Sequence, residues 1–127
     1  MRILVIDDDE LILIAISEKL KSKGHAVWTA INGRKALDVL NTEKINLIVC
    51  DVIMPGVSAL SLLGMLRKHG IHNIPLILIS SLSSANIISE SLGLKIFDFL
   101  TKPIDYDYLN SRISELEKRK EGNVPEE

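Results

Sequence analysis

The chain has 127 residues, of which 46% are hydrophobic and 25% are charged, and its formal net charge is −2. This length and composition predict one ordinary globular domain, and they exclude a disordered tail, a collagen-like fibre and a disulfide-stapled miniprotein. Without an excess of positive charge, direct binding to nucleic acid or to an anionic membrane is not expected. Because the single cysteine, Cys50, cannot form an internal disulfide, we expect a reducing environment.

No stretch of the sequence resembles a membrane span or a secretory signal. The apolar runs are far shorter than the roughly 18 to 20 residues that cross a bilayer. The apolar start of the chain is interrupted by four consecutive acidic residues, Asp7 to Glu10, which a signal peptide does not tolerate. We therefore expect a cytoplasmic protein with no membrane partner.

Five short apolar segments alternate along the chain with five amphipathic ones. Strands are predicted at 3–6, 26–29, 46–50, 76–79 and 96–100, and helices at 10–23, 33–43, 58–69, 84–94 and 105–120. Three of the strands are apolar at every position, which indicates burial on both faces, as in a parallel sheet covered by helices. The pattern predicts a doubly wound α/β domain over residues 1–118, followed by a polar tail or linker at 119–127.

Polar side chains follow four of the five predicted strands. Carboxylates follow the first and third strands, a hydroxyl the fourth and an amine the fifth, in the residues Asp7, Asp8, Asp51, Ser80 and Lys102. Ligands of doubly wound sheets bind at the carboxyl ends of the strands, so these groups are expected to converge on one edge. A single Asp after a strand is usually a helix cap, and we assign Asp9 that role, with Glu10 in the first turn.

Carboxylates crowded on one edge repel one another, so their clustering indicates a bound cation. Oxygen ligands without His or Cys favour a hard ion, most naturally Mg²⁺. The ion and Lys102 together balance the charges of Asp7, Asp8 and Asp51. A phosphoryl group on Asp51 is then stabilised by the ion, by Lys102 and by a hydrogen bond from Ser80. These residues predict a phosphoryl-transfer site with an aspartate nucleophile.

The sequence resembles the receiver domains of two-component response regulators over about residues 1–118. Four segments carry the resemblance, in the same order as in the family: Ile3-Leu4-Val5-Ile6-Asp7-Asp8, Asp51-Val52-Ile53-Met54-Pro55-Gly56, Pro75-Leu76-Ile77-Leu78-Ile79-Ser80 and Asp98-Phe99-Leu100-Thr101-Lys102-Pro103. The resemblance implies a flavodoxin-like fold with five parallel strands in the order 2-1-3-4-5. A flavodoxin-like cofactor protein or a dinucleotide-binding domain is disfavoured, because a phosphate-binding loop is missing after the first strand.

The resemblance also implies chemical roles for individual residues. Asp51 is expected to accept a phosphoryl group from a histidine kinase or a histidine phosphotransfer protein, so that the domain is a phosphoacceptor rather than a turnover enzyme. Mg²⁺ is expected to be held by Asp7, Asp8, Asp51 and the backbone carbonyl of Ile53. Lys102 pairs first with the acidic pocket and then with the phosphoryl group, and the Lys102–Pro103 bond is typically cis in the family.

Signal output is expected to depend on Ser80, which moves toward the phosphoryl group, and on Phe99, whose side chain changes rotamer with it. An unknown output partner is expected on the surface formed by the segments 84–94, 96–100 and 105–120. Two readings stay open: a receiver-like scaffold that is never phosphorylated, and the receiver fragment of a longer regulator with an output domain.

Two further expectations concern assembly and lifetime. Many transcriptional receivers dimerise through charge pairs, of which Asp98 and Arg112 match one, but the remaining positions do not match: Ile88, Leu94, Phe97 and Tyr108. We therefore expect no dimer of that charge-paired type, and a partly exposed apolar surface on the predicted helix at 84–94. Apolar side chains at Ile53 and Leu82 are expected to exclude the hydrolytic water and give a long-lived phosphorylated state.

Overall fold

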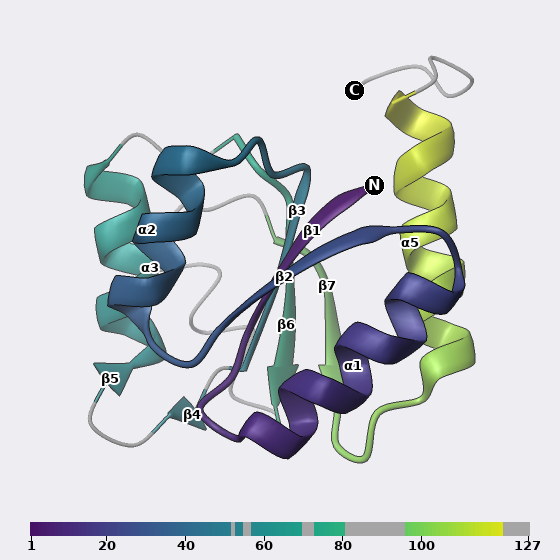
Figure 1. Cartoon of the computed structure of the whole chain (residues 1–127), viewed down its shortest axis with the longest axis horizontal. Helices are drawn as coiled ribbons and strands as arrows, with labels where there is room; N and C mark the ends of the chain where they lie inside the picture. Colours follow the sequence, from purple (N-terminus) through teal and green to yellow (C-terminus); the bar gives the residue numbers. More distant parts are fainter. Residues whose placement is uncertain (52, 55–56, 70–72, 81–95, 121–127) are drawn as a thin grey trace.

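Five parallel strands form the central sheet of the protein (Figure 1). The computed structural model describes residues 1–51, 53–54, 57–69, 73–80 and 96–120. The sheet has the order β2-β1-β3-β6-β7, which confirms the predicted order 2-1-3-4-5. Its strands are β1 (Arg2–Ile6), β2 (Ala26–Ala30), β3 (Leu47–Asp51), β6 (Leu76–Ser80) and β7 (Ile96–Thr101). A short antiparallel pair, β4 (Ile53–Met54) and β5 (Val57–Ser58), lies between β3 and the next helix.

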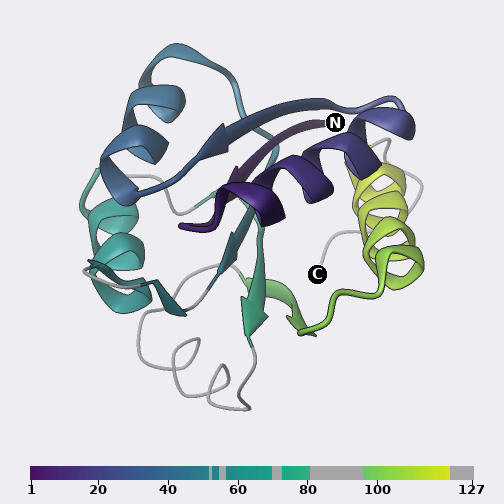
Figure 2. The same cartoon turned by 60° about the horizontal axis from the view of Figure 1, so that its bottom comes forward.

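Helices cover both faces of the sheet, as burial of the central strands on both faces requires. The four described helices are α1 (Glu10–Ser22), α2 (Gly33–Thr42), α3 (Ala59–Lys68) and α5 (Tyr106–Lys120). Helices α1 and α5 lie on one face and α2 and α3 on the other, which is also evident in the turned view of Figure 2. The helix predicted at 84–94 lies outside the described residues. None of the described helices is both long and apolar enough to span a membrane.

Two hydrophobic clusters, one on each face of the sheet, form the core. Because side chains alternate along a strand, Leu4 and Ile6 of β1 enter one cluster, and Ile3 and Val5 enter the other. The second cluster also contains the buried stripe of α5, which consists of Leu109, Ile113 and Leu116. This stripe repeats at i, i+4 and i+7, which is the spacing of one face of a helix.

Local signals in the sequence fix both ends of α1. Asp9 caps the helix, because its Oδ1 accepts hydrogen bonds from the N–H groups of Leu11 and Ile12 at 2.9 and 3.4 Å. Past the other end, Gly24 has a φ of +92°, a left-handed conformation that glycine adopts without steric cost. The cap holds the start of α1 beside Asp7 and Asp8, where β1 ends.

Candidate functional site

The polar residues predicted after the strands lie together at the carboxyl edge of the sheet, the lower edge in Figure 1. Asp7 directly follows β1, and Lys102 directly follows β7. Asp51 and Ser80 are the last residues of β3 and β6, where they still pair in the sheet with neighbouring strands. Four parallel strands therefore bring residues far apart in the sequence to one edge.

Three carboxylates form the acidic part of this edge. Asp7, Asp8 and Asp51 each offer one oxygen, and these oxygens lie within 4.8 Å of one another. Asp8 is exposed, whereas Asp7 and Asp51 are buried, with only 1% and 3% of their surface accessible. Such a set of oxygen ligands, partly buried and partly open to solvent, could hold a hard divalent cation.

Only one of the two carboxylate oxygens of Asp7 has a hydrogen-bond partner in the described part of the chain. Its Oδ1 accepts a hydrogen bond of 2.9 Å from the backbone N–H of Asp9. Its Oδ2 is buried and has no hydrogen-bond partner in the described part of the chain. Because buried polar atoms are normally paired, an unpaired carboxylate oxygen beside two other carboxylates fits a cation ligand.

Burial and neighbouring charge both disfavour ionisation of Asp7. Burial raises the pKa of Asp7 from 3.8 to about 6, and the negative charge of Asp51 acts in the same direction. The N–H group of Asp9 and the positive charge of Lys102 oppose this shift of the pKa. The ionised form of Asp7 is therefore disfavoured in the folded protein, and a bound cation would stabilise it.

Lys102 brings the positive charge that this edge needs. Its Nζ donates a hydrogen bond of 2.8 Å to Oδ2 of Asp51, which forms a partly buried ion pair. Burial alone would lower the pKa of Lys102, but the hydrogen bond to Asp51 and the surrounding carboxylates outweigh it, so the pKa is raised. Lys102 is thus held as an ammonium group against the proposed nucleophile.

The backbone around Lys102 ties β7 to β6 at the site. The N–H group of Lys102 donates to the carbonyl oxygen of Ser80 at 3.2 Å, and the Lys102–Pro103 peptide bond is cis, as the sequence predicted. Ser80 is buried, with 2% of its surface accessible. These contacts hold the serine and the lysine at neighbouring positions of the same edge.

The remaining predicted residues differ in how the structure places them. Phe99 is half-buried and packs against the core cluster on the α2 and α3 face. Ile53 belongs to the short strand β4, but its side chain lies outside the described part of the chain. The same holds for Leu82, Ile88 and Leu94, so the expectations about phosphoryl lifetime and about the apolar surface at 84–94 stay predictions.

Sequence reasoning missed two structural features of this region. The hydrogen bond from Asp9 to Asp7 was not foreseen, although the two-residue spacing and the capping role of Asp9 were a signal for it. Asp98 and Arg112 were interpreted only as a pair between two chains, but they form an ion pair of 2.7 Å within one chain. No sequence pattern distinguishes these two arrangements.

The sequence matches the family model of the response regulator receiver domain over residues 3–114, and the chain therefore belongs to this family. The transcriptional regulatory protein CrdR of Helicobacter pylori is 31% identical over 112 residues, which are 88% of this chain and 53% of CrdR. The alkaline phosphatase synthesis transcriptional regulatory protein PhoP of Bacillus subtilis is 31% identical over 126 residues, 98% of this chain and 51% of PhoP. The chain spans about half the length of these relatives.

Solved structures lead to the same family. The receiver domain of the Francisella response regulator 1452 is 38% identical, with a TM-score of 0.80, over 94% of this chain and 98% of that one. The response regulator TrrA of Thermotoga maritima, solved in complex with Mg²⁺–BeF, is 29% identical with a TM-score of 0.75, over 91% of this chain and 97% of that one. The family and the predicted flavodoxin-like fold are therefore both confirmed.

Proposed function

We propose that this receiver domain accepts a phosphoryl group on Asp51 from a phosphohistidine of a histidine kinase or a histidine phosphotransfer protein. The observation that carries the proposal is the ion pair of 2.8 Å between Asp51 and Lys102. A carboxylate oxygen of Asp51 also lies within 4.8 Å of one from Asp7 and one from Asp8. Ordinary structural roles leave a group of three clustered carboxylates unexplained. A site that must receive a dianionic phosphoryl group explains both the carboxylates and the ammonium group.

In the proposed step, a carboxylate oxygen of Asp51 attacks phosphorus and forms an O–P bond. The N–P bond of the donor phosphohistidine breaks, and the imidazole nitrogen leaves with the electron pair of that bond. Lys102, already at hydrogen-bond distance from Asp51, is placed to pair with the oxygens of the incoming group. Its raised pKa keeps this side chain positively charged throughout. Asp51 acts once per phosphorylation, as a phosphoacceptor rather than a turnover catalyst.

Mg²⁺ is the cofactor that this donor set fits best. We propose that Asp7, Asp8 and Asp51 hold it, with the backbone carbonyl of Ile53 as a further ligand. The unpaired Oδ2 of Asp7 supports this, as does the complex of the relative TrrA with Mg²⁺–BeF. When bound, the ion neutralises charge on the phosphoryl oxygens. Asp7 and Asp8 hold this ion and take no covalent part in the transfer.

We further propose that Ser80 and Phe99 convert phosphorylation into a change of surface. Ser80 ends β6, its carbonyl oxygen accepts a hydrogen bond from Lys102, and we expect its hydroxyl to hydrogen-bond a phosphoryl oxygen. Phe99 lies on the neighbouring strand, paired with Leu78, and its ring packs on the same face as Leu78. We expect an output partner to bind, in the cytoplasm, at a surface made of β7, α5 and the helix predicted at 84–94.

The test is intact-protein mass spectrometry after incubation with a small phosphodonor such as acetyl phosphate. We expect a mass gain of one phosphoryl group with Mg²⁺, and no gain with EDTA or in Asp51→Asn. Asp38→Asn, which removes the same charge from the exposed surface of α2, is the matched control and should be phosphorylated like the wild type. A wild type that gains no mass would favour the alternative, a scaffold that acts by contact alone.

A further inference from the structure

The edge strand β7 contains one residue more than the stretch of β6 that it pairs with. Ile96 pairs with Leu76 and Asp98 pairs with Ile77, so the register shifts at Phe97, which has no partner of its own. An extra residue of this kind redirects the side chains that follow it, and such bulges are common at sheet edges near functional sites. The shift at Phe97 therefore decides which face of the sheet each later residue of β7 occupies.

The packing on either side of β7 follows from this shift. Phe97 packs against the cluster that contains Ile77 and the buried stripe of α5. Phe99 pairs with Leu78 and packs against the opposite cluster, toward α2 and α3. Two aromatic rings only two residues apart thus lie on opposite faces of one strand, although strict alternation would place them on the same face.

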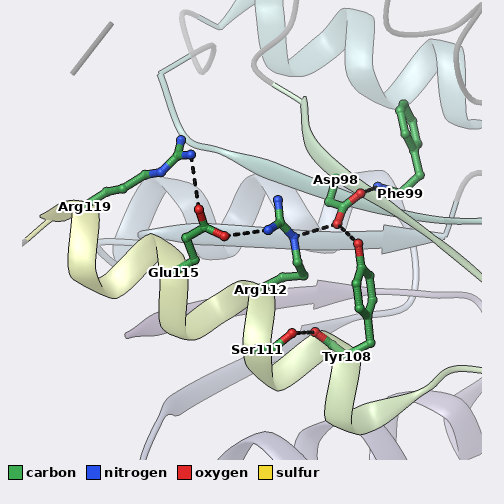
Figure 3. A network of polar contacts seen from close by, with 7 residues as sticks. All are labelled: Asp98, Phe99, Tyr108, Ser111, Arg112, Glu115 and Arg119. Atoms are coloured by element: carbon green, nitrogen blue, oxygen red, sulfur yellow. Dashed lines mark hydrogen bonds and ion pairs between the residues drawn. The ribbon is translucent and has the colours of Figure 1, made fainter. Parts of the chain in front are cut away.

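Asp98, between the two rings, connects β7 to α5 (Figure 3). Its Oδ2 accepts hydrogen bonds of 2.7 Å from Nε of Arg112 and of 2.5 Å from the hydroxyl of Tyr108. Its Oδ1 accepts a hydrogen bond of 2.7 Å from the backbone N–H of Phe99. One carboxylate therefore holds two side chains of α5 and the backbone of the proposed switch residue.

On α5, ion pairs hold the Arg112 side chain that contacts Asp98. Arg112 donates from Nη1 to Glu115 at 2.6 Å, and Glu115 also pairs with Arg119 at 3.4 Å (Figure 3). The guanidinium groups of Arg112 and Arg119 lie 4.4 and 5.3 Å from the centre of the Phe97 ring. Asp98 and Arg112 expose only 21% and 25% of their side chains, so their ion pair is less screened than one at the open surface.

We propose that Asp98 is a positioning residue, which fixes the backbone at Phe99 to α5, so that a movement of Phe99 is transmitted to the Arg112 side of α5. The inference rests on the proposed function in one respect, the switch role of Phe99. Glu115 and Arg119 adjoin this link through Arg112 and the Phe97 ring rather than through Asp98 itself. Asp98 accordingly acts through Phe99 and touches no reacting atom.

The composition of the chain offers a direct test, because Phe97 and Phe99 are its only two phenylalanines. Labelling with 4-fluorophenylalanine gives two ¹⁹F resonances, one from Phe99 and one from Phe97, whose ring lies against the guanidinium of Arg112, and Phe97→Tyr assigns them. Mg²⁺ with BeF₃⁻ serves as the phosphoryl mimic. In the wild type we expect both resonances to shift with the same saturation curve. In Asp98→Ala we expect the Phe99 resonance to be displaced before any ligand is added, and the response of Phe97 to be lost.

Two further variants make the result specific. Tyr108→Leu removes the hydroxyl that binds Asp98 without adding a third phenylalanine, and it should weaken the response of Phe97 even if Asp98→Ala fails to fold. Arg119→Gln changes the surroundings of the Phe97 ring without touching Asp98, so it should move the Phe97 resonance and leave the ligand response of both rings intact.

The proposal is overturned if Phe97 follows the ligand in Asp98→Ala and Tyr108→Leu as it does in the wild type. It is also overturned if Phe99 keeps its wild-type resonance in unliganded Asp98→Ala. A wild type in which the ligand moves neither resonance would contradict the switch role of Phe99 instead. In that case, the shift of the Phe99 resonance in unliganded Asp98→Ala would still test whether Asp98 positions the backbone at Phe99.

Discussion

Asp7 is the residue at which the functional site and the stability of the fold conflict most clearly. It is buried, one of its oxygens has no hydrogen-bond partner in the described structure, and its pKa is raised to about 6. In a protein without metal, the ionised carboxylate therefore costs free energy above that pH. Such a cost is expected where a residue is kept for binding rather than for folding.

This conflict predicts a pH-dependent stability of the metal-free protein. Between the ordinary pKa of 3.8 and the folded value of about 6, the folded state binds more protons at Asp7 than the unfolded state does. Stability must therefore fall as the pH rises through this window, by about 2 to 3 kcal/mol for a shift of this size. Asp7→Asn should abolish this loss and leave the metal-free variant more stable than the wild type above pH 6.

Urea unfolding between pH 4 and pH 8, in the presence of a chelator, measures this effect. The difference between Asp7→Asn and the wild type should grow with pH over the window and then stay constant. Asp38→Asn on the exposed surface of α2 controls for the loss of one negative charge. A difference that is independent of pH would contradict the electrostatic origin of the gain.

The three carboxylates are not expected to contribute equally to Mg²⁺ binding. One oxygen of Asp7 is already engaged by the N–H of Asp9, whereas Asp8 is exposed. We therefore expect Asp8→Asn to weaken Mg²⁺ binding more than Asp7→Asn does, by about tenfold for the loss of a direct charged ligand. Calorimetric titration at pH 8 would show this, and equal losses in the two variants would refute the assignment.

At the scale of elements, the N-cap of α1 is Asp9, which lies only two residues after Asp7 and therefore helps to position the site. Asp9→Ala removes an acceptor for the N–H groups of Leu11 and Ile12, and should lower the free energy of unfolding by about 1 kcal/mol. Asp9→Ser, which retains a capping oxygen, should recover most of this loss. Thermal unfolding of both variants tests the prediction, and equal destabilisation by Ala and Ser would argue against capping as the cause.

The chain leaves the other end of α1 through the left-handed conformation of Gly24, whose N–H donates to the carbonyl oxygen of Lys21. A Cβ atom added at this position would meet no atom within 4 Å, so an alanine here costs only the strain of a positive φ. We expect Gly24→Ala to destabilise the protein by about 1 kcal/mol, and Gly24→Asn by less, because Asn tolerates this conformation better. Unfolding in urea measures both, and a larger loss in Gly24→Asn than in Gly24→Ala would show that a contact is involved after all.

Most elements were predictable because their patterns are local. The strands at 3–6 and 76–79 are apolar at every position, and α5 carries its buried residues at helical spacing, so their structural ends lie within one or two residues of the predicted ones. The short pair β4 and β5 and the extra residue at Phe97 were not predicted. Both arise from how neighbouring strands pair, and the local sequence holds no distinct signal for either.

The residues of the site could be predicted from the sequence, but their environment could not. A parallel sheet places the carboxyl ends of its strands at one edge, and the structure does bring Asp7, Asp51, Ser80 and Lys102 to that edge. The raised pKa of Asp7 could not be read from the sequence, since it depends on burial. The network around Asp98 was equally hidden, because it joins side chains on a strand and a helix that meet only in the folded chain.

At the scale of the whole molecule, the sheet is the scaffold, and the residues of the candidate site lie at its carboxyl edge. Four strands hold the acidic residues and Lys102 in place, while β7 also carries the residues that contact α5. Under the proposed function, β6 and β7 connect the phosphorylated edge to the face that contacts α5. The proposed function requires that a single residue, Asp51, receives the phosphoryl group.

Identifying the modified residue tests this requirement most directly. After incubation with acetyl phosphate and Mg²⁺, borohydride converts an aspartyl phosphate into homoserine, which peptide mass spectrometry can locate. Trypsin cleavage at Lys44 and Arg67 leaves Asp51 as the only acidic residue of its peptide, well separated from Asp7 and Asp8. We expect homoserine at position 51 alone, and only when Mg²⁺ is present. Homoserine at position 7 or 8, or none anywhere in the chain, would contradict Asp51 as the phosphoacceptor.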